Sequence, residues 1–428
     1  VSALILLCAG SIFQPLQKVF ILNVVFVVYC LLLMIFTMFV LSSHMQGDKI
    51  VSRPRGLPTE FPVITILVPL YREAGMVRPL HKALQQLEYP TNKLDIKILV
   101  EHDDPETIAA TRNFCTDSHF QIIVIPPSGP KTKPKALNVG LWLALGEYCV
   151  VYDAEDRPDP DQIAKAVQKF RASPSDVACL QARLNYYNRD QNILTRLFAL
   201  EYAFLFDMIL PALSKLGAPL PLGGTSNFFN TRALRESGGW DPYNVTEDAD
   251  IGLRLSARGY RCEILDSTTW EEATPGILGW IRQRSRWIKG YIQTWFVHTR
   301  WTAFKGNRWK QMLTLHLLVG GVIISALINP FFWALYALWM SGLTPALEFL
   351  FPQPLGAIAL ISFLGGNLLL IYMLIIAPLE RRWYRYCFAA LLFPFYWFGQ
   401  SVAGFIALAQ FIRRPFFWDK TTHHPQVQ

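Results

Sequence analysis

Residues 148–156 read Tyr-Cys-Val-Val-Tyr-Asp-Ala-Glu-Asp, an apolar run that ends in three acids within four residues. Such a run predicts a buried β-strand over 148–152. Similar β-rich runs, separated by helical patterns at 76–87 and 134–145, occupy 63–69, 96–101 and 121–125. This alternation predicts a largely parallel sheet, and ligands of such sheets bind beyond the carboxyl ends of the strands. The residues that follow each strand are therefore candidates for a binding site.

The α/β pattern fills only the middle of the chain. Of the 428 residues, 52% are hydrophobic and 17% are charged, and apolar residues gather toward both ends. Uncharged stretches of about 20 residues match the hydrocarbon core of a bilayer. We therefore expect transmembrane segments within 1–45 and 311–412, an α/β domain over 50–299 and a tail over 413–428.

Charge placement predicts the topology. Much of the net charge of +8 lies beside the apolar segments, at Arg53, Arg55, Arg381, Arg382, Arg385, Arg413 and Arg414. This is typical of the positive-inside rule, so it indicates a cytosolic α/β domain and gives no reason to expect nucleic acid as a partner. The expected crossings are 19–41, 312–340, kinked at Asn329-Pro330, 355–378 and 387–412. The last is one crossing or, broken near Pro394, a hairpin with a cytosolic C-terminus.

The cysteines and the start of the chain give two further indications. The seven cysteines are scattered, without a Cys-x-x-Cys pair, which argues against a disulfide framework and against a zinc site. We expect a reducing compartment, with the protein in the inner membrane of a bacterium. The chain begins inside an apolar segment at 3–13, so we expect further sequence before Val1.

Polar residues follow the first two predicted strands. Tyr71 and Glu73 come after 63–69, and Asp103 and Asp104 come after 96–101. Side chains at these positions can hold the base or ribose of a nucleotide, and we expect them to contact the donor. Solvated loop acids, or caps for the following helix, are the alternative.

Basic and acidic runs flank the next helix and strand. Lys131, Lys133 and Lys135 lie at a helix N-terminus, where an anion such as a diphosphate would relieve their conflict with the helix dipole. A solvated basic turn accounts equally well for these three lysines. Asp153, Glu155 and Asp156 repel one another unless a cation intervenes, and their oxygens suit Mg²⁺ or Mn²⁺ on a diphosphate. The alternative is an acidic turn that caps a helix over 158–170.

Two downstream motifs complete the set. Thr246-Glu247-Asp248 opens a predicted helix with Thr246 as its N-cap, and Asp248 can also act as a general base toward an acceptor hydroxyl. Residues 280–289, Trp-Ile-Arg-Gln-Arg-Ser-Arg-Trp-Ile-Lys, combine bases and tryptophans beside the membrane. An interfacial anchor is the alternative for this stretch.

The order of these motifs resembles that of the processive family 2 glycosyltransferases of the cellulose-synthase-like kind, a group with cellulose, chitin and hyaluronan synthases. The shared motifs are Asp103-Asp104, Lys135-Ala136-Leu137-Asn138, Asp153-Ala154-Glu155, Gly223-Gly224-Thr225, Thr246-Glu247-Asp248 and Gln283-x-x-Arg286-Trp287. The last two, in this order beside a membrane segment, are strongly specific. The resemblance covers about residues 60 to 300 and implies a GT-A (Rossmann-like) domain inserted between transmembrane helices.

Roles follow from the resemblance residue by residue. It implies that Asp103 and Asp104 contact the uridine of a UDP-sugar, and that Lys135 and Arg286 contact its diphosphate. Asp153 holds Mg²⁺ or Mn²⁺ with Glu155, Asp156 or both, since Glu155 departs from the usual Asp-x-Asp. Asp248, beside Glu247, is implied to be the general base, and the acceptor site comprises Thr225, Gln283 and Trp287.

The implied activity is an inverting hexosyltransferase that lengthens a β-linked exopolysaccharide and translocates it. UDP-glucose is the favoured donor, followed by UDP-N-acetylglucosamine; further partners are the polysaccharide, the bilayer and accessory subunits. A non-processive enzyme that makes a lipid-linked sugar is the alternative. For the aromatic residues Trp333, Trp339, Tyr372, Trp397 and Phe405, a sugar path competes with a lipid-facing role.

Two expectations concern how these residues are arranged in space. Asp153, Asp248 and Trp287 must share one cavity if the acids, the base and the acceptor platform act together. The tail of related synthases closes over the nucleotide, and by that likeness Trp418 and Lys420 are expected to cover the donor site. A disordered tail is the equal alternative.

Overall fold

The computed structural model describes residues 15–46, 60–300 and 308–414. The apolar segment at 3–13, the flanking residues Arg53 and Arg55, and the tail residues Trp418 and Lys420 lie outside the described residues.

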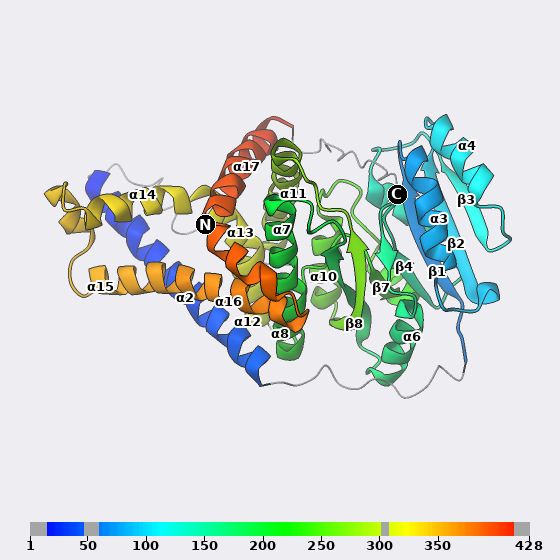
Figure 1. The fold of residues 1–428 in the computed structure, drawn as a ribbon, viewed down its shortest axis with the longest axis horizontal. Coiled ribbons are helices and arrows are strands. Elements are labelled where there is room, and N and C mark those ends of the chain that lie inside the picture. Colours follow the sequence, from blue (N-terminus) through cyan, green and yellow to red (C-terminus); the bar gives the residue numbers. More distant parts are fainter. Residues whose placement is uncertain (1–14, 47–59, 301–307, 415–428) are drawn as a thin grey trace.

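A mixed eight-stranded sheet forms the centre of the α/β part, in the order β3-β2-β1-β4-β7-β6-β8-β5 (Figure 1). The strands are β1 Ile64–Leu70, β2 Leu94–Glu101, β3 Phe120–Ile125, β4 Tyr148–Val151, β5 Arg157–Pro158, β6 Val177–Tyr186, β7 Asn227–Asn230 and β8 Arg261–Glu271. The four predicted strands are confirmed as β1 to β4, and they pair in parallel.

The far half of the sheet departs from the expectation of a largely parallel sheet. Strand β7 runs antiparallel to both β4 and β6, and β5 runs antiparallel to β8. The helix expected over 158–170 therefore begins later, at Gln162, because Arg157 and Pro158 pair with β8 as a short strand. These pairings join segments far apart in the chain, which local sequence patterns do not encode.

Helices cover both faces of the sheet, and this explains the predominantly apolar sequences of β1 and β4. Helices α3 and α6 pack on one face, whereas α5, α7 and α8 pack on the other. The helices of this part are α3 Val77–Gln85, α4 Pro105–Phe114, α5 Lys133–Trp142, α6 Gln162–Ala172, α7 Ile193–Ala203, α8 Leu210–Leu216, α9 Thr231–Glu236, α10 Glu247–Ala257 and α11 Ile277–His298.

A second, helical part lies beyond α7 and α11 (Figure 1). It contains α2 Pro15–Met45, α12 Arg308–Leu313, α13 Gly320–Leu327, α14 Asn329–Met340, α15 Leu355–Leu360, α16 Gly366–Glu380 and α17 Phe393–Arg413. Short 3-10 helices occur at η1 Ala74–Met76, η2 Thr91–Lys93, η5 Pro345–Leu350 and η7 Tyr384–Leu392. The helix breaks at Ile328, just before Asn329-Pro330, and Pro394 lies in the first turn of α17, near the expected break.

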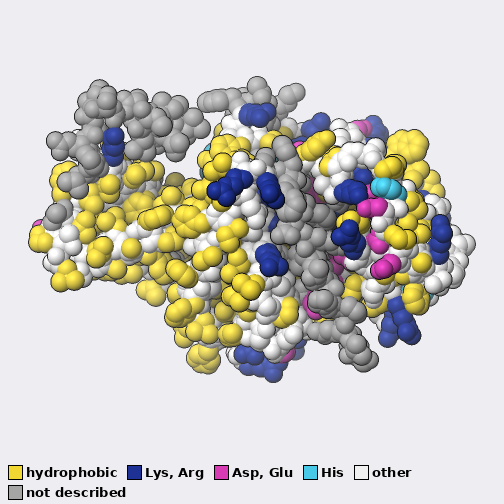
Figure 2. Space-filling model, turned by 90° about the horizontal axis from the view of Figure 1, so that it is seen from above, with side chains coloured by type: hydrophobic (Ala, Val, Ile, Leu, Met, Phe, Trp, Pro, Cys, Tyr) yellow, Lys and Arg dark blue, Asp and Glu magenta, His cyan; other side chains and the backbone are white. Residues whose placement is uncertain are grey.

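Five helical segments among the described residues are long and apolar enough to cross a membrane: Gln17–Met45, Ile193–Leu216, Trp309–Leu327, Leu355–Glu380 and Tyr384–Arg413. Four coincide with the predicted segments. The second was not predicted, and most of it is buried between the sheet and the helical part although it carries Arg196, Glu201, Asp207 and Lys215. Figure 2 shows hydrophobic side chains spread over the helical part and charged side chains gathered nearer the sheet.

Candidate active site

One cavity of about 630 Å³ extends from the carboxyl ends of β1, β2 and β4 into the helical part. Its wall near the sheet includes Tyr71, Glu73, Lys133, Asp153, Glu155, Gly224, Thr225, Glu247 and Asp248, and the wall near α11 includes Gln283, Arg284, Arg286 and Trp287. Asp153, Asp248 and Trp287 therefore line a single cavity, as expected. Chain segments more than 100 residues apart meet there, since the turn after β4 carries Asp153 and α11 carries Trp287.

The acidic turn after β4 is stabilised by its last residue, Asp156. The Asp156 carboxylate accepts hydrogen bonds from the Asp153 backbone N–H, at 2.7 Å, and from the Thr225 hydroxyl. Asp156 is buried, and the Thr225 hydroxyl oxygen also lies 3.0 Å from the carbonyl oxygen of Val151. Asp156 and the Thr225 hydroxyl thus support the turn, while Asp153 and Glu155 border the cavity.

The electrostatics of this turn suit a cation. Burial, reinforced by the charge of Asp153, raises the pKa of Glu155 to about 7. Burial also raises the pKa of Asp156 well above its usual range, and one of its carboxylate oxygens has no hydrogen-bond partner among the described residues. Crowded carboxylates whose charged forms are disfavoured by burial fit a divalent cation that prefers oxygen ligands, Mg²⁺ or Mn²⁺.

The lysine that faces the acids is Lys133. Its ammonium group lies 2.5 Å from the Asp153 carboxylate and donates to the Gly224 carbonyl at 2.7 Å. Lys135, on which the sequence prediction rested, instead pairs with Glu101 at 3.1 Å and donates to the Pro126 carbonyl. Two residues along a helix are rotated by about 200°, so adjacent lysines of the motif face opposite directions.

This placement predicts unequal effects of two substitutions. We expect Lys133→Met to weaken nucleoside diphosphate binding by about 10- to 150-fold, because a charge-assisted hydrogen bond contributes about 1.5–3 kcal/mol. Lys135→Met should have a smaller effect. Calorimetric titration with nucleoside diphosphate compares the two, with melting temperatures as a check on folding. A larger loss of affinity in Lys135→Met would contradict the placement.

Asp103 and Asp104 lie at the end of β2, and their side chains have partners in the protein. Asp104 is the N-cap of α4, where it accepts from the Thr107 N–H at 3.2 Å and also from the backbone N–H of Arg72. This is the capping role that competed with nucleotide binding. Asp103 lies 2.5 Å from the ammonium group of Lys131, in a partly exposed position.

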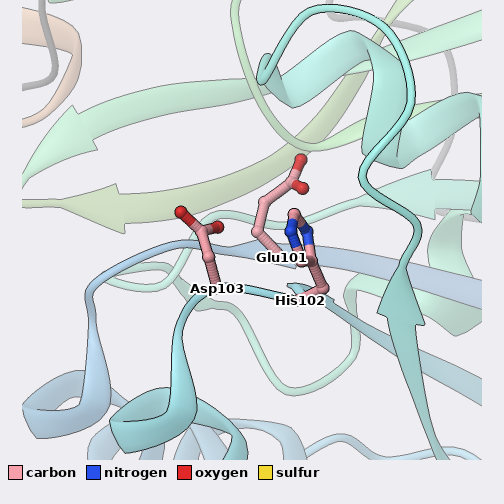
Figure 3. Close-up of side chains that lie close together, drawn as sticks. All are labelled: Glu101, His102 and Asp103. Atoms are coloured by element: carbon pink, nitrogen blue, oxygen red, sulfur yellow. The ribbon is translucent and has the colours of Figure 1, made fainter.

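Glu101, His102 and Asp103 form the one group of described residues whose potential ligand atoms all lie within 4.8 Å of one another (Figure 3). The sequence did not point to this group. Lys135 neutralises Glu101 and Lys131 neutralises Asp103, so the charge of the pair is already balanced. The turn of Asp153 and Glu155 remains the better candidate for a cation, because the raised pKa values of Glu155 and Asp156 show carboxylates whose charged forms a cation would stabilise.

The start of α10 carries the expected base. Asp248 accepts a hydrogen bond from the Ala249 N–H at 2.7 Å, and burial raises its pKa to about 6. Burial and the neighbouring charge of Asp248 raise the pKa of Glu247 further, to about 8. At neutral pH, Asp248 is thus the carboxylate more ready to accept a proton. Thr246 occupies the N-cap position but makes no side-chain cap bond there.

Helix α11 packs closely on this turn. A Cβ atom on Gly290 would lie 2.8 Å from the backbone nitrogen of Thr246, so only glycine permits the approach. The Gln293 side chain accepts from the Val245 N–H at 3.2 Å, and Asn244 donates to Thr294 at 2.9 Å. The helix that carries Gln283, Arg286 and Trp287 is therefore fixed relative to Asp248.

Two residues that the sequence prediction passed over lie on the same wall. Arg284 sits between the predicted Gln283 and Arg286, and it forms an ion pair with Glu201 of α7. Glu201 is an acid inside the apolar segment Ile193–Leu216, and an acid in such a segment is itself a signal of function. That signal was available in the sequence.

Of the five aromatic residues considered for a sugar path, Trp333 and Trp397 line the cavity. Trp339 stacks on Phe351 with ring centroids 4.1 Å apart, and Tyr372 and Phe405 are largely exposed. The deep part of the cavity also meets three π-helical stretches, η3 Phe204–Ile209, η4 Thr314–Val319 and η6 Ile361–Gly365. Such stretches interrupt α-helices frequently at functional sites.

Comparison with known proteins gives a family and a fold. The family model described as glycosyl transferase family group 2 matches residues 148–418. The chain is 26% identical over 238 residues to glucomannan 4-beta-mannosyltransferase 1 of Oryza sativa subsp. japonica, covering 54% of this chain and 46% of that protein. It is 25% identical over 250 residues to the probable glycosyltransferase YdaM of Bacillus subtilis (strain 168), covering 58% and 59%.

Among solved structures, the mannosyltransferase PcManGT from Pyrobaculum calidifontis, in complex with GDP-Man and Mn²⁺, has a TM-score of 0.53 and 20% identity. The match covers 82% of this chain and 99% of that one, and it shows a shared fold. The chain spans about half the length of the curated relatives that it matches.

Proposed function

Because the chain belongs to glycosyl transferase family group 2, we propose that it is a membrane-integrated, inverting hexosyltransferase that extends a β-linked polysaccharide. The observation that carries the proposal is the common cavity of Asp153, Asp248 and Trp287. We place the protein in a bacterial inner membrane with its sheet in the cytosol, in line with its apolar helices and flanking arginines.

The proposed reaction uses side chains on opposite sides of the cavity. Asp248 takes the proton of an acceptor hydroxyl, whose oxygen then attacks the anomeric carbon of the donor from the face opposite the leaving group. Lys133 and Arg286 stabilise the charge that develops on the departing nucleoside diphosphate. A divalent cation held by Asp153 and Glu155 supplies further positive charge beside the diphosphate when it is bound. An α-linked donor gives a β-linked product.

The acceptor side is assigned to α11. We propose that Trp287 stacks on the terminal sugar and that Gln283 hydrogen-bonds to its hydroxyls. Gln283 is held by a hydrogen bond from Thr274 at 3.2 Å. The cavity continues past Trp287 to Asn329, Trp333 and Trp397, and we propose that the growing chain leaves by this path. The extension of the cavity from the sheet into the helical part supports a path for a growing chain.

Two sources of evidence favour different donor sugars. The motif pattern favours UDP-glucose, whereas two of the three named proteins are mannosyltransferases, and one of these was solved with GDP-Man. Purified protein in lipid, supplied with UDP-glucose, UDP-N-acetylglucosamine or GDP-mannose and Mg²⁺ or Mn²⁺, tests the proposal. Digestion with linkage-specific glycosidases identifies the product. Failure to transfer from any nucleotide sugar would overturn the proposed function, and products of one added sugar would favour the non-processive alternative.

The shifted pKa of Asp248 predicts the pH dependence. A general base works only when ionised, so kcat/KM should fall about tenfold for each pH unit below about 6 and level off above it. Initial rates between pH 4.5 and 8, at saturating metal, measure this limb. An acid limb centred near pH 4, the ordinary value for an aspartate, would contradict the role of burial.

A further inference from the structure

A partly buried polar cluster joins three helices beside the acceptor side of the cavity. We define it as Glu201 of α7, Arg284 of α11, and Tyr396 and Gln400 of α17. The Arg284 guanidinium forms a two-pronged ion pair with the Glu201 carboxylate and donates to the Tyr396 hydroxyl at 2.6 Å. Glu201 also accepts from Tyr396 at 2.7 Å and from Gln400 at 2.9 Å. The carboxylate is thus held from two helices at once.

The cluster is tightly packed. Arg284 is 8% exposed, and the indole N–H of Trp280 donates to the Tyr396 hydroxyl at 3.3 Å. A Cβ atom on Gly399 would lie 2.8 Å from the Trp280 ring, so α17 approaches α11 as closely as glycine allows. The Glu201 carboxylate and the Tyr396 hydroxyl hold the Arg284 guanidinium, which leaves it little freedom to rotate.

The same guanidinium faces Trp287. Its central carbon lies 4.8 Å from the Trp287 ring centroid and 4.4 Å from that of Phe198. Stacking between an arginine and an indole is favourable when the cation is shielded from water. Phe198 and Tyr202 contact the same indole, with ring centroids 5.9 and 6.5 Å away. The orientation of Trp287 therefore depends on where Glu201 and Tyr396 hold Arg284.

We propose that Arg284, Glu201 and Tyr396 act as a positioning clamp, through which α17 sets the orientation of the acceptor platform Trp287. The effect of the clamp on acceptor binding rests on the proposed function. The clamp itself depends only on the contacts between α7, α11 and α17. These are positioning residues, since they act through Trp287. Helix α17 of the helical part thereby controls the orientation of Trp287 on α11.

The choice of substitution follows from the charges. Removing Arg284 or Glu201 alone leaves a buried charge without its partner, which destabilises the fold whatever the role of the clamp. Tyr396→Phe deletes one hydroxyl and keeps the ion pair. The double variant Glu201→Leu with Arg284→Met removes both charges together, a change that proteins often tolerate.

Tyr336 offers a matched control for Tyr396. It is also a buried tyrosine of the helical part, and its hydroxyl donates to the side chain of Asn23 at 3.1 Å. It belongs to a different cluster, with Phe26, Phe332 and Phe363. Tyr336→Phe therefore removes a comparable buried hydrogen bond without touching the clamp.

The test uses the full chain in lipid nanodiscs and two measurements. Hydrogen exchange over residues 283–290 should become about tenfold faster in Tyr396→Phe, and more so in the double variant, but not in Tyr336→Phe. In parallel, the acceptor KM should rise about tenfold while the donor KM and the hydrolysis of donor without acceptor stay unchanged.

The outcomes separate the two proposals. Exchange over 283–290 that is unchanged, or changed equally in Tyr336→Phe, overturns the clamp. An active enzyme whose acceptor KM is unaffected by the variants overturns the link to acceptor binding. A wild-type protein without transfer from any nucleotide sugar removes the proposed function, and the exchange measurement still decides whether α17 fixes α11.

Discussion

Asp248→Asn should lower kcat by about 10²–10⁴-fold and leave the donor KM nearly unchanged. The amide has the shape of the carboxylate but cannot accept the proton of the acceptor hydroxyl. The loss is expected in kcat because proton transfer occurs on the way to the transition state. Initial rates with saturating donor and acceptor measure it, and a binding titration with nucleoside diphosphate verifies that the donor site is intact.

Asp241→Asn is a suitable control for this change. Asp241 precedes the same turn, and its side chain accepts a hydrogen bond from the Tyr243 N–H at 2.9 Å in an exposed position. An amide oxygen can make the same bond, so activity should be retained. Equal losses in the two variants, or near-wild-type activity in Asp248→Asn, would show that Asp248 is not the base.

Asp153→Asn should abolish metal-dependent transfer, with a loss of about 10³-fold or more. A cation beside a diphosphate contributes several kcal/mol to stabilising developing charge, and each 1.36 kcal/mol corresponds to a factor of ten in rate. Mn²⁺ binding in the presence of nucleoside diphosphate, followed by calorimetry, gives a readout that does not depend on turnover. Asp161→Asn is the control, since Asp161 is a surface acid paired with Lys165.

Two neighbouring substitutions distinguish the possible ligands that the sequence left open. Glu155 borders the cavity, so Glu155→Gln should weaken Mn²⁺ binding strongly. Asp156→Asn keeps an oxygen that can accept from Thr225 and from the Asp153 N–H, so it should mainly affect stability. Stronger metal loss in Asp156→Asn than in Glu155→Gln would reverse this assignment.

The sequence predicted the parallel half of the sheet, strands β1 to β4, correctly. Strands β1 to β4 are short apolar runs bounded by polar residues, and each is encoded by its own residues. Four of the five apolar segments were predictable for the same reason, since length and hydropathy are local properties. Strands β6 and β8, with 10 and 11 residues, were not recognised, because partners distant in the chain stabilise them.

The candidate site shows the same division. Motif order was enough to nominate Asp153, Asp248 and Trp287, and the cavity brings them together. It could not select Lys133 over Lys135, because both fit the same basic motif and only the helix rotation separates them. Nor could it tell that Asp104 caps α4 or that Asp156 supports its turn.

By itself the sequence determined strands β1 to β4, four of the five apolar segments, and which acidic, basic and aromatic side chains are present. These features depend on the composition and spacing of neighbouring residues. Only the tertiary structure decided which groups face the cavity and which hold the scaffold, as with Glu201 and Arg284 on α7 and α11. Side-chain direction depends on helix rotation and on packing between distant segments, and no short stretch of sequence contains that information.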